Sequence, residues 1–342
     1  MKAVVYRGAR TLDIEERPEA EPGHGELGIA VAYTGICGTD LHIYHGDMDA
    51  RVGTGAVIGH EMSGRVAAIG PGVTGWSVGQ PVTVMPTRAC GECPACVRGH
   101  SHICHRMQFL GIDSPGAMQS RWNVPADLVI ALPEDLPLEQ AALIEPTAVA
   151  VHDVRRADVG ADDHVVVVGG GPVGVLIAAV AQGRGARVLL VEPDAFRREV
   201  AVELGIETLD PAAADVPATV EERTGGAGAD IAFEVSGSAA GVVTAVDVLT
   251  TRGRLVMVAI HPQLRPVNLH RFFWRELELF GARLYQRDDM VEAVQLIATG
   301  AVPAQRLISR VGPVGTVADA FTALESGGSV MKVLIDWQEQ AR

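Results

Sequence analysis

Residues 165–174 read V-V-V-V-G-G-G-P-V-G, and this stretch decides the fold of the second half of the chain. Four consecutive valines predict a buried β-strand, because β-branched side chains favour extended backbone. The three glycines predict a tight turn, and the apolar segment 173–184 predicts a helix. A strand, a glycine turn and a helix in direct succession indicate the start of a βαβ unit, in which the strands run parallel.

Strand-like and helix-length segments continue to alternate between about residue 151 and residue 285. The further strand-like segments are 188–191, 231–235 and 255–259, and the further helical ones are 194–204 and 239–250. This alternation is typical of α/β proteins. We therefore predict βαβ units and a parallel sheet.

The glycines after the first strand also predict a ligand. Gly169, Gly171 and Gly174 fit the pattern G-x-G-x-x-G, which is weak evidence by itself. Here the pattern follows a strand, opens a helix at Pro172, and precedes an acidic residue, Glu192, at the end of the next strand. Such glycines let the backbone approach a pyrophosphate at a helix N-terminus, where the helix dipole favours anions. The setting favours a dinucleotide site over a glycine turn that binds nothing.

Glu192 indicates which dinucleotide is bound. A carboxylate at this position accepts hydrogen bonds from the ribose hydroxyls and repels a 2'-phosphate, so NAD is favoured over NADP. Arg197 is the counter-argument, because a guanidinium five residues later could pair with that phosphate or could flank the adenine.

The remaining parts of the chain have a different pattern. In residues 1–150, short β-rich segments alternate with Gly and Pro turns, which predicts an irregular, mostly antiparallel sheet; these segments are 3–6, 27–33 and 81–85. Residues 286–342 contain a helix-like segment, 288–299, and a strand-like one, 330–335. We expect this last part to fold back onto the first domain, so that residues 151–285 form the second domain.

Composition excludes several classes of protein. The 342 residues are 48% hydrophobic and 20% charged, which is typical of globular domains, and the net charge of -14 opposes binding to nucleic acid. The longest apolar stretch, 165–181, is shorter than the roughly 20 residues of a membrane-spanning helix and is broken by glycines. The first residues, M-K-A-V-V-Y-R-G-A-R, have no apolar signal-peptide core. We therefore expect a cytoplasmic protein without a membrane or nucleic-acid partner.

Four cysteines lie in a C-x2-C-x2-C-x7-C run within a lobe of about residues 88–106. Four thiolates at this spacing can close a tetrahedral site around one zinc ion and leave no position for a substrate, so the site is predicted to be structural. Disulfides are the alternative, but the number of cysteines is odd and a chain of this length needs no covalent staples. The predicted zinc ligands are Cys90, Cys93, Cys96 and Cys104.

The fifth cysteine, Cys37, has partners elsewhere in the chain for a second zinc site. Gly59 is followed by His60 and Glu61, and Glu145 precedes a proline. A Cys, a His and carboxylates can hold a zinc ion that keeps an exchangeable position. Each residue also has a simpler interpretation: a core cysteine, a hydrogen-bonded core histidine, an exposed strand residue and a helix-start carboxylate.

Taken together, these motifs resemble the zinc-dependent medium-chain alcohol dehydrogenases over essentially the whole chain. The shared motifs, in order, are C-G-T-D-L-H at 37–42, G-H-E at 59–61, the four-cysteine lobe, E-P at 145–146 and the dinucleotide pattern at 169–174. The resemblance implies an α/β protein with a GroES-like, β-rich catalytic domain, a Rossmann domain with a doubly wound parallel sheet inserted before its last segment, and an active site in the cleft between them. It also implies a homo-oligomer, either a tetramer or a dimer.

The resemblance assigns roles to particular residues. Cys37 and His60 become catalytic zinc ligands, and Glu61 and Glu145 supply or exchange the remaining protein ligand. Binding both carboxylates would make the site anionic, so we expect only one to be bound with substrate. His60 and Glu61 can both reach the metal only if the backbone turns there, because consecutive strand residues face opposite sides.

The implied reaction is hydride transfer from a small-molecule alcohol to NAD, or the reverse reduction of a ketone. Zinc lowers the pKa of the alcohol, and the carbinol carbon gives hydride to the nicotinamide. By resemblance, Thr39 and His42 pass the released proton toward solvent. By resemblance to threonine 3-dehydrogenases, further cofactor contacts are Val173, Glu192, Arg197, Val258, Ala259, Ile260, Leu284 and Tyr285.

The motifs indicate the substrate less clearly than they indicate the reaction. Residues 37–44 are similar to threonine 3-dehydrogenases, whereas 145–152 and 276–289 look more like butanediol and polyol dehydrogenases. We expect a secondary alcohol of a vicinal diol or polyol, with L-threonine as the alternative. A non-catalytic cofactor-binding protein and a zinc-free quinone or enone reductase remain alternatives of other classes.

Overall fold

The computed structural model describes residues 1–338, which form two compact units. The β-rich unit consists of Met1–Glu145, Gln286–Gly300 and the chain from Ile308 onward, and the parallel-sheet unit consists of Pro146–Tyr285 and Ala301–Leu307. The boundary between the two units follows Glu145, within helix α5 (Ile144–Arg156). The sequence pattern predicts this boundary near residue 150. The short segment 301–307 belongs with the parallel-sheet unit, although the sequence pattern assigns it to the returning part.

A seven-stranded sheet is the main element of the β-rich unit, and its pairs are antiparallel except for β16 with β17. The strand order is β16-β17-β3-β4-β5-β9, and β8 pairs with β3. The strands are β3 (Glu26–Gly35), β4 (Glu61–Ile69), β5 (Pro81–Val84), β8 (Arg121–Pro125), β9 (Val129–Ala131), β16 (Ile308–Pro313) and β17 (Lys332–Asp336). Two small sheets accompany it: β1 (Lys2–Gly8) with β2 (Thr11–Glu16), and β6 (Thr87–Arg88) with β7 (Gln108–Phe109).

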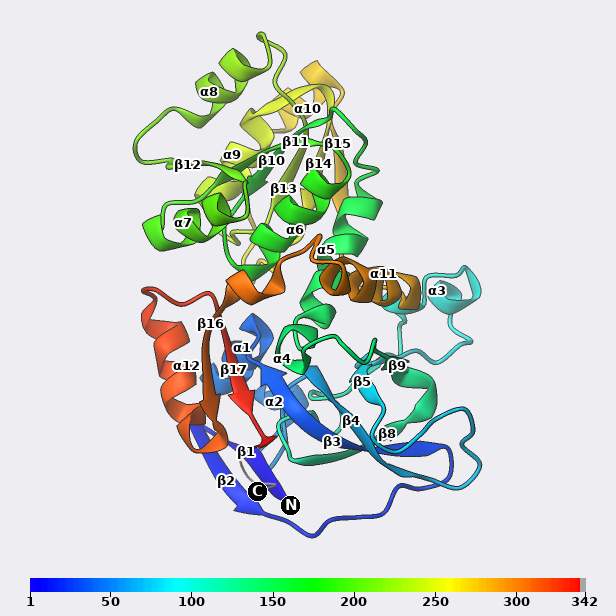
Figure 1. The fold of residues 1–342 in the computed structure, drawn as a ribbon. Coiled ribbons are helices and arrows are strands. Elements are labelled where there is room, and N and C mark those ends of the chain that lie inside the picture. The colour runs from blue at the N-terminus through cyan, green and yellow to red at the C-terminus, as the bar shows by residue number, and fades with distance from the viewer. Residues whose placement is uncertain (339–342) are drawn as a thin grey trace. The chain divides into compact units, whose positions relative to one another are not determined.

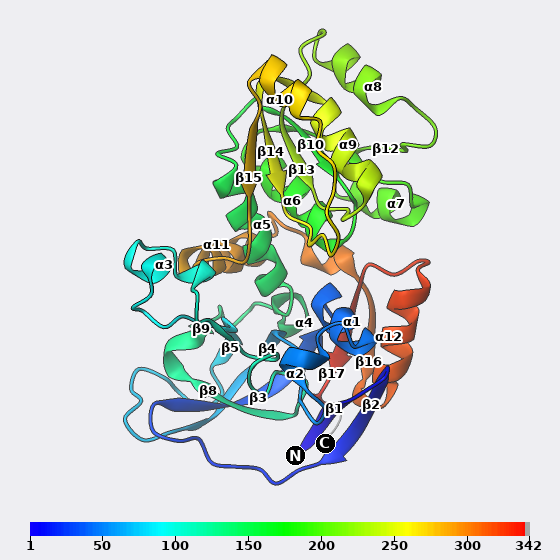
Figure 2. The same cartoon turned by 180° about the vertical axis from the view of Figure 1, so that it is seen from behind.

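The last strand of the chain completes this sheet. Leu334 of β17 lies opposite Gly35 of β3, although the two residues are far apart in the sequence. Figure 1 shows the red strand β17 beside the blue strand β3, and Figure 2 shows the same pair from behind. Residues 332–336 therefore lie beside the end of β3, close to the segments around residues 37 and 60.

Short helices connect the strands of the β-rich unit. They are α1 (Gly38–His45), α2 (Asp49–Val52), α3 (Pro94–Val97), α4 (Leu138–Ala141), α11 (Arg287–Ala298) and α12 (Val317–Ser326), with 3-10 turns at Ser101–Ile103, Ala126–Leu128 and Val314–Thr316. The start of α1 is fixed by its own sequence, because the Asp40 carboxylate accepts a hydrogen bond from the N–H of Cys37 at 2.9 Å. Gly46 ends the helix in the left-handed conformation, with φ at 88°.

A six-stranded, fully parallel sheet forms the parallel-sheet unit, in the order β12-β11-β10-β13-β14-β15. The strands are β10 (His164–Val168), β11 (Arg187–Val191), β12 (Glu207–Leu209), β13 (Ala229–Glu234), β14 (Leu249–Met257) and β15 (Glu278–Gly281). The helices are α6 (Pro172–Gly183), α7 (Ala195–Glu203), α8 (Val216–Arg223), α9 (Ala239–Asp247) and α10 (Leu269–Arg275), with a 3-10 turn at Ala304–Leu307. This is the doubly wound strand order of a Rossmann fold, so the predicted α/β class is confirmed.

The core of this sheet explains why the valine run forms its first strand. Val165, Val166, Val167 and Val168 are all at least 95% buried. Val166 and Val168 pack in a cluster with Leu189 of the neighbouring strand. Since successive strand residues face opposite sides, Val165 and Val167 must be buried on the other face. A strand covered on both faces accommodates an uninterrupted apolar run.

The described part of the chain has no helix that is both long and apolar enough to cross a membrane.

Candidate zinc sites and dinucleotide pocket

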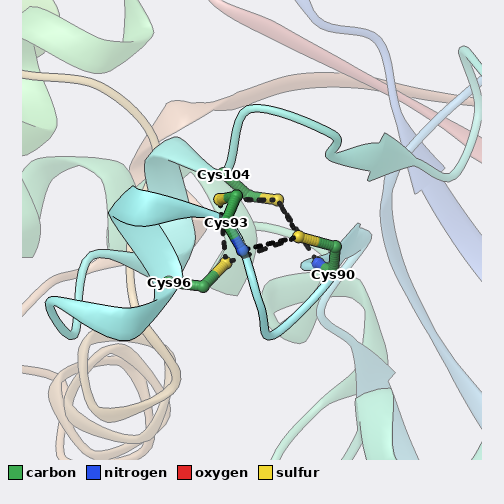
Figure 3. A group of neighbouring side chains, drawn as sticks. All are labelled: Cys90, Cys93, Cys96 and Cys104. Atoms are coloured by element: carbon green, nitrogen blue, oxygen red, sulfur yellow. Dashed lines mark hydrogen bonds between the residues drawn. The ribbon is translucent and has the colours of Figure 1, made fainter.

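The four cysteines of the lobe between β6 and β7 lie with their sulfur atoms facing one another (Figure 3). Four of the Sγ to Sγ distances are 4.0 Å (Cys90 to Cys96), 3.5 Å (Cys93 to Cys96), 3.8 Å (Cys93 to Cys104) and 3.5 Å (Cys104 to Cys90). Thiolates at about 2.3 Å from a tetrahedral zinc ion are about 3.8 Å apart. The four residues therefore fit a zinc ion.

Backbone groups prepare these sulfurs for a cation. The N–H groups of Cys90 and Arg106 donate to the sulfur of Cys104, and the N–H of His105 donates to that of Cys93. Hydrogen bonds from the backbone of Cys96 and His105 lower the pKa of Cys93 to about 6, whereas burial raises the pKa of Cys96 to about 12. A bound cation would allow all four thiols to ionise together. All five cysteines are free, so disulfides do not form this lobe.

A second cluster lies at one end of strands β3 and β4. Cys37 is the N-cap of α1, His60 directly precedes β4, and Glu61 is the first residue of that strand. One ligand atom from each of the three residues lies within 4.8 Å of the others. The pairing of β3 with β4 explains this, because Gly35 lies opposite Glu61 and brings both ends of the connection together.

Two glycines make space for this cluster. A Cβ atom on Gly35 would lie 2.2 Å from Oε2 of Glu61, so a larger residue would displace the carboxylate. Gly59 has φ at 91°, and a Cβ there would lie 2.6 Å from the side chain of Met118. The unusual backbone at Gly59 supplies the turn that lets both His60 and Glu61 reach the cluster.

Asp40 supports His60 from within α1. The carboxylate is fully buried, and its Oδ1 lies 3.8 Å from Nδ1 of His60. At this distance the two groups form an ion pair without a hydrogen bond, and neither atom has a hydrogen-bond partner among the described residues. Metal-bound histidines usually direct their second ring nitrogen to a carboxylate, and the same pairing here would leave Nε2 for a metal. Burial lowers the pKa of His60, but Asp40, Cys37 and Glu145 outweigh it and hold the pKa well above its usual value. A divalent cation would take the place of that proton.

Lys332 is a component of the site that the sequence motifs do not identify. Its ammonium is 2.7 Å from both carboxylate oxygens of Glu61 and 3.3 Å from the carbonyl oxygen of Ile36. Lys332 is 3% exposed and Glu61 is 1% exposed. Burial lowers the pKa of Lys332, but Glu61 and Cys37 outweigh that effect and raise it. The available signal was a lone lysine within an apolar strand of a chain that has only Lys2 besides it.

The other predicted catalytic residues have distinct positions. Glu145 is buried in the first turn of α5, outside the trio of Cys37, His60 and Glu61, but its charge raises the pKa of both His60 and Lys332. Thr39 and His42 are three residues apart in α1, which places them on one face of the helix. The imidazole of His42 is exposed, and its Nδ1 is 3.0 Å from the Asp47 carboxylate.

The parallel-sheet unit contains a pocket of about 380 Å³ at the carboxyl ends of β10, β11 and β13. Its lining includes Gly169, Gly171, Glu192, Arg197 and Ser236. Ligands of doubly wound sheets bind at this edge, where the strand order changes direction. The pocket therefore lies where the glycine pattern predicts a dinucleotide.

The glycines of the pocket are required by close contacts. Gly169 has φ at 108°, and a Cβ there would lie 2.7 Å from the nitrogen of Ser236. A Cβ on Gly170 would lie 2.9 Å from the side chain of Glu192, and one on Gly174 would lie 1.9 Å from the carbonyl oxygen of Gly169. Gly169, Gly170 and Gly174 therefore leave no room for a side chain, whereas a Cβ on Gly171 would meet nothing closer than a guanidinium nitrogen of Arg197 at 4.0 Å. The absence of side chains leaves the backbone of the turn close to any bound phosphate.

Glu192 is held in place by backbone N–H groups. Oε2 accepts a hydrogen bond from Gly170 at 2.5 Å and Oε1 accepts one from Asp194 at 2.9 Å. The carboxylate is thereby fixed beside the glycine turn. Arg197 belongs to the first turn of α7 and lines the same pocket. The two residues that bear on the choice between NAD and NADP, Glu192 and Arg197, therefore line one pocket.

The other predicted cofactor contacts are not among the residues that line this pocket. Pro172 and Val173 begin α6 behind the glycine turn. Val258, Ala259 and Ile260 follow the end of β14, and Ile260 is 77% exposed. Leu284 and Tyr285 follow β15, and Tyr285 is fully buried.

Family models match most of the chain. Residues 23–134 match the alcohol dehydrogenase GroES-like domain, and residues 172–299 match the zinc-binding dehydrogenase domain.

Three curated proteins illustrate the similarity. The chain is 46% identical over 336 residues to 2-dehydro-3-deoxy-L-galactonate 5-dehydrogenase of Pseudoalteromonas atlantica, covering 98% of each chain. It is 32% identical to sorbitol dehydrogenase of Halalkalibacterium halodurans, over 98% of this chain and 99% of that one. It is also 32% identical to L-threonine 3-dehydrogenase of Rhizobium etli, with the same coverage.

Solved structures share the whole fold. The 2R,3R-butanediol dehydrogenase of Bacillus subtilis is 31% identical with a TM-score of 0.91, over 98% of this chain and 99% of that one. A zinc-binding dehydrogenase from Sinorhizobium meliloti bound to NADP is 28% identical with a TM-score of 0.93, over 98% of each chain. A protein described as a short chain alcohol dehydrogenase from Escherichia coli CFT073, complexed with NADH, is 27% identical with a TM-score of 0.91, over 98% of this chain and 99% of that one.

Proposed function

The chain belongs to the zinc-dependent medium-chain alcohol dehydrogenases, and we propose that it oxidises a secondary alcohol of a polyhydroxylated sugar acid or polyol with NAD. It is an oxidoreductase that acts on an alcohol group with a nicotinamide cofactor. The observation that carries the proposal is the cluster of Cys37, His60 and Glu61 within 4.8 Å, in a chain that also has the dinucleotide pocket.

The zinc ligands of the proposal are two separate sets. Cys90, Cys93, Cys96 and Cys104 would hold a structural ion, and Cys37, His60 and either Glu61 or Glu145 would hold a catalytic one, which gives two ions per subunit. Glu61 is already bound to Lys332 by both oxygens, so metal binding through Glu61 has to compete with that pair. We therefore propose that Glu61 and Glu145 exchange as the remaining protein ligand of the catalytic ion.

In the proposed mechanism, zinc at Cys37 and His60 would supply a Lewis acid that polarises the alcohol oxygen. Asp40 orients His60, and Lys332 offsets the negative charge of Glu61, so that the donor set does not become too anionic to stabilise an alkoxide. Thr39 and His42 move the released proton along one face of α1 to solvent. The glycine turn and Glu192 hold the cofactor for hydride transfer.

The preference for NAD is supported by the position of Glu192. Its carboxylate is fixed by the N–H groups of Gly170 and Asp194 on the wall of the pocket. A 2'-phosphate approaching this wall would meet a buried negative charge. Similar structures are known with NADH and with NADP, so Arg197 is the residue through which NADP would bind if the preference were reversed.

The substrate class follows from the similar proteins. The relative that is 46% identical is named for oxidation at carbon 5 of a deoxy sugar acid, which carries a secondary alcohol among other hydroxyl groups. The sorbitol and butanediol dehydrogenases act on alcohols of the same kind. L-Threonine is the second candidate, because C-G-T-D-L-H-I-Y at 37–44 is similar to threonine dehydrogenases and several of these enzymes match the chain.

An initial-rate panel tests the proposal. The purified protein, loaded with zinc, is assayed with NAD and with NADP against 2-dehydro-3-deoxy-L-galactonate, D-sorbitol, (2R,3R)-2,3-butanediol and L-threonine. We expect the highest kcat/KM with NAD and a sugar acid or polyol. A highest value with L-threonine would support the second candidate, and no turnover of any alcohol, with NADH still bound, would favour the non-catalytic alternative.

We also propose that the protein is a cytoplasmic homo-oligomer. Edge strand β15 is largely exposed and contains Leu279, whose exposed fraction is 51%. The preceding helix, α10, contains Phe273 and Trp274, which are 74% and 72% exposed. An open strand edge with large apolar side chains favours association with a second copy. Unpaired cysteines that hold zinc suit a reducing compartment. Light scattering after size-exclusion chromatography measures the number of subunits, and a monomer would contradict the proposal.

A further inference from the structure

A buried carboxylate that belongs to neither zinc site lies at the carboxyl end of β13. Glu234 has no exposed surface, and a carboxylate in that position needs hydrogen bonds to remain charged. Its Oε1 accepts from the nitrogen of Ser236 at 3.0 Å, from the hydroxyl of Ser236 at 2.5 Å and from the nitrogen of Gly237 at 3.0 Å. Its Oε2 is 2.8 Å from Nε2 of His261. The side chain of Glu234 is therefore hydrogen-bonded both to the turn at Ser236 and Gly237 and to the loop that contains His261.

The turn held by Oε1 is a wall of the dinucleotide pocket. Ser236 and Ser238 both line the pocket, and their hydroxyl groups are 3.0 Å apart. The turn lies directly against two glycines: a Cβ on Gly169 would lie 2.7 Å from the nitrogen of Ser236, and one on Gly241 would lie 2.0 Å from its hydroxyl. Any movement of this turn therefore changes the shape of the site that receives the cofactor.

The loop held by Oε2 begins where β14 ends. The backbone carbonyl of Glu234 accepts from Val258 and Ala259 at 3.0 Å each, and its side chain reaches His261 three residues after Val258. Since the carboxylate only accepts, Nε2 of His261 must donate to it. Glu234 thus ties the ends of two adjacent strands together through both its backbone and its side chain.

His261 is largely buried and has one further feature. Its Nδ1 is buried without a hydrogen-bond partner among the described residues, and the side chain is 13% exposed. A buried imidazole with one unsatisfied nitrogen carries a cost, which is offset if the other nitrogen makes a strong hydrogen bond. The contact with Glu234 is therefore what keeps His261 in this position.

We propose that Glu234 and His261 are positioning residues for the cofactor, which lock the ends of β13 and β14 in the shape that NAD binding requires. The inference rests on the proposed NAD-linked function. It assigns the pair to binding of the cofactor and not to the hydride transfer, because neither residue belongs to the zinc clusters. Loss of the pair should raise the KM for NAD with little change in kcat, which is the signature of a uniform binding contribution.

Substitutions of His261 distinguish this role from simple packing. In His261→Gln the side-chain amide can still donate to Glu234, whereas His261→Leu keeps the bulk and removes the donor. We expect His261→Leu to weaken NADH binding about tenfold or more, because the loop after β14 is then no longer bonded to Glu234, and His261→Gln to stay within about threefold of the unmodified protein. Fluorescence titration with NADH measures the Kd, and initial rates at saturating substrate separate KM from kcat.

Glu234→Gln is the second variant, since an amide would present N–H groups to donors that are already fixed. It should weaken NADH binding at least as much as His261→Leu. Glu207→Gln is its matched control, because Glu207 is an exposed carboxylate of the same unit whose partner is the exposed Arg223. Unfolding temperature and zinc content, measured on each variant, should match the control within a few degrees and within error.

The inference is overturned if His261→Leu binds NADH as tightly as the unmodified protein, if His261→Gln is as impaired as His261→Leu, or if the loss appears in kcat with KM unchanged. Failure of the proposed function has a different signature, because the unmodified protein would then bind no NADH or turn over no alcohol. If Glu234→Gln does not fold, the pair of His261 variants decides the question alone.

Discussion

Lys332 changes the electrostatics of the proposed catalytic site at the scale of single residues. The half-buried thiol of Cys37 and the buried side chains of His60 and Glu61 are joined there by a buried ammonium that contacts both oxygens of Glu61. The ammonium offsets the charge of Glu61, so a cation bound by Cys37 and His60 would keep a net positive field. A positive field is what stabilises an alcohol as its proton leaves.

Replacing Lys332 by methionine should leave the Glu61 carboxylate buried without a cation. We expect a loss of about 3–5 kcal/mol in the free energy of unfolding, because breaking a buried pair strands the remaining charge. Urea unfolding of the zinc-free protein measures it. Lys2→Met is the matched control, and the double variant Glu61→Gln with Lys332→Met should recover part of the loss. Equal stability of Lys332→Met and Lys2→Met would show that the pair contributes nothing.

The sequence alone could place some of these residues and not others. Cys37, His60 and Glu61 were candidates because their chemistry suits zinc, and the structure brings their ligand atoms together. Their roles at the metal stay predictions. Asp40 and Lys332 were not identified, because an aspartate in a helix and a lysine in a strand have many uses. Only the pairing of β17 with β3 brings Lys332 to the site.

At the scale of elements, strands with strong local patterns were located well. The valine strand and the helix after it lie within one residue of their predicted bounds. Strand β14 begins at Leu249, whereas the pattern predicts a start at residue 255. Its first half, L-T-T-R-G-R, is polar and contains glycine, so local propensity hides it, and only pairing with β13 makes it a strand. The short edge strand β15 was missed because its 4 residues, E-L-F-G, are too few to show an alternating pattern.

The glycine turn should respond to a single methyl group. Gly169→Ala places a Cβ against the backbone of Ser236 at φ of 108°, so the turn has to shift. We expect the KM for NAD to rise about tenfold or more while zinc content stays unchanged. Gly183→Ala in α6 is the matched control, since a Cβ there meets nothing within 4 Å. Equal kinetics of the two variants would contradict a dinucleotide cradle.

The contact between β1 and α2 predicts a pH effect. The phenol of Tyr6 donates to the Asp49 carboxylate at 2.6 Å, and burial together with that carboxylate raises the pKa of Tyr6 to about 12. The folded chain therefore holds this proton more tightly than the unfolded chain, whose tyrosines ionise near pH 10. The stability that it contributes is complete below pH 10 and is lost as the pH rises toward 12.

Tyr6→Phe should remove that component. We expect the variant to be less stable by about 1 kcal/mol at neutral pH and to show a shallower decline of stability between pH 10 and 12. Chemical unfolding at a series of pH values measures both effects. An identical decline in the two proteins would mean that Tyr6 does not titrate differently on folding.

At the scale of the whole molecule, the two proposed zinc ions have separate tasks within the β-rich unit. The closed cysteine lobe would contribute to folding, whereas the cluster at Cys37 would contribute to chemistry. Cys93→Ala should therefore lower the unfolding temperature by roughly 10 °C, corresponding to several kcal/mol. Cys37→Ala should abolish turnover, retain the fold and reduce the zinc content from two ions to one. Metal analysis and calorimetry measure these values, and an equal loss of stability in both variants would refute the division.

The architecture was more predictable from sequence in one unit than in the other. In the parallel-sheet unit, most strands pair with the strand before or after them in the chain, so alternating local patterns were sufficient to predict a parallel sheet. The doubly wound order was an expectation from the family resemblance. In the β-rich unit, β17 pairs with β3, and the distance along the chain hides that contact. The sequence predicted that residues 286–342 return to the first domain. It did not predict that β17 pairs with β3, or that this pairing brings Lys332 to Glu61.

The pairing of β17 with β3 also sets an order of events during synthesis. Lys332 and Glu61, which meet in the finished site, are 271 residues apart in the chain. A ribosome that has released Cys37, His60 and Glu61 still has the whole parallel-sheet unit to translate before the neutralising ammonium emerges. Until then no ammonium competes for the Glu61 carboxylate, so the cluster of Cys37, His60 and Glu61 reaches its final charge only after the end of the chain has been made.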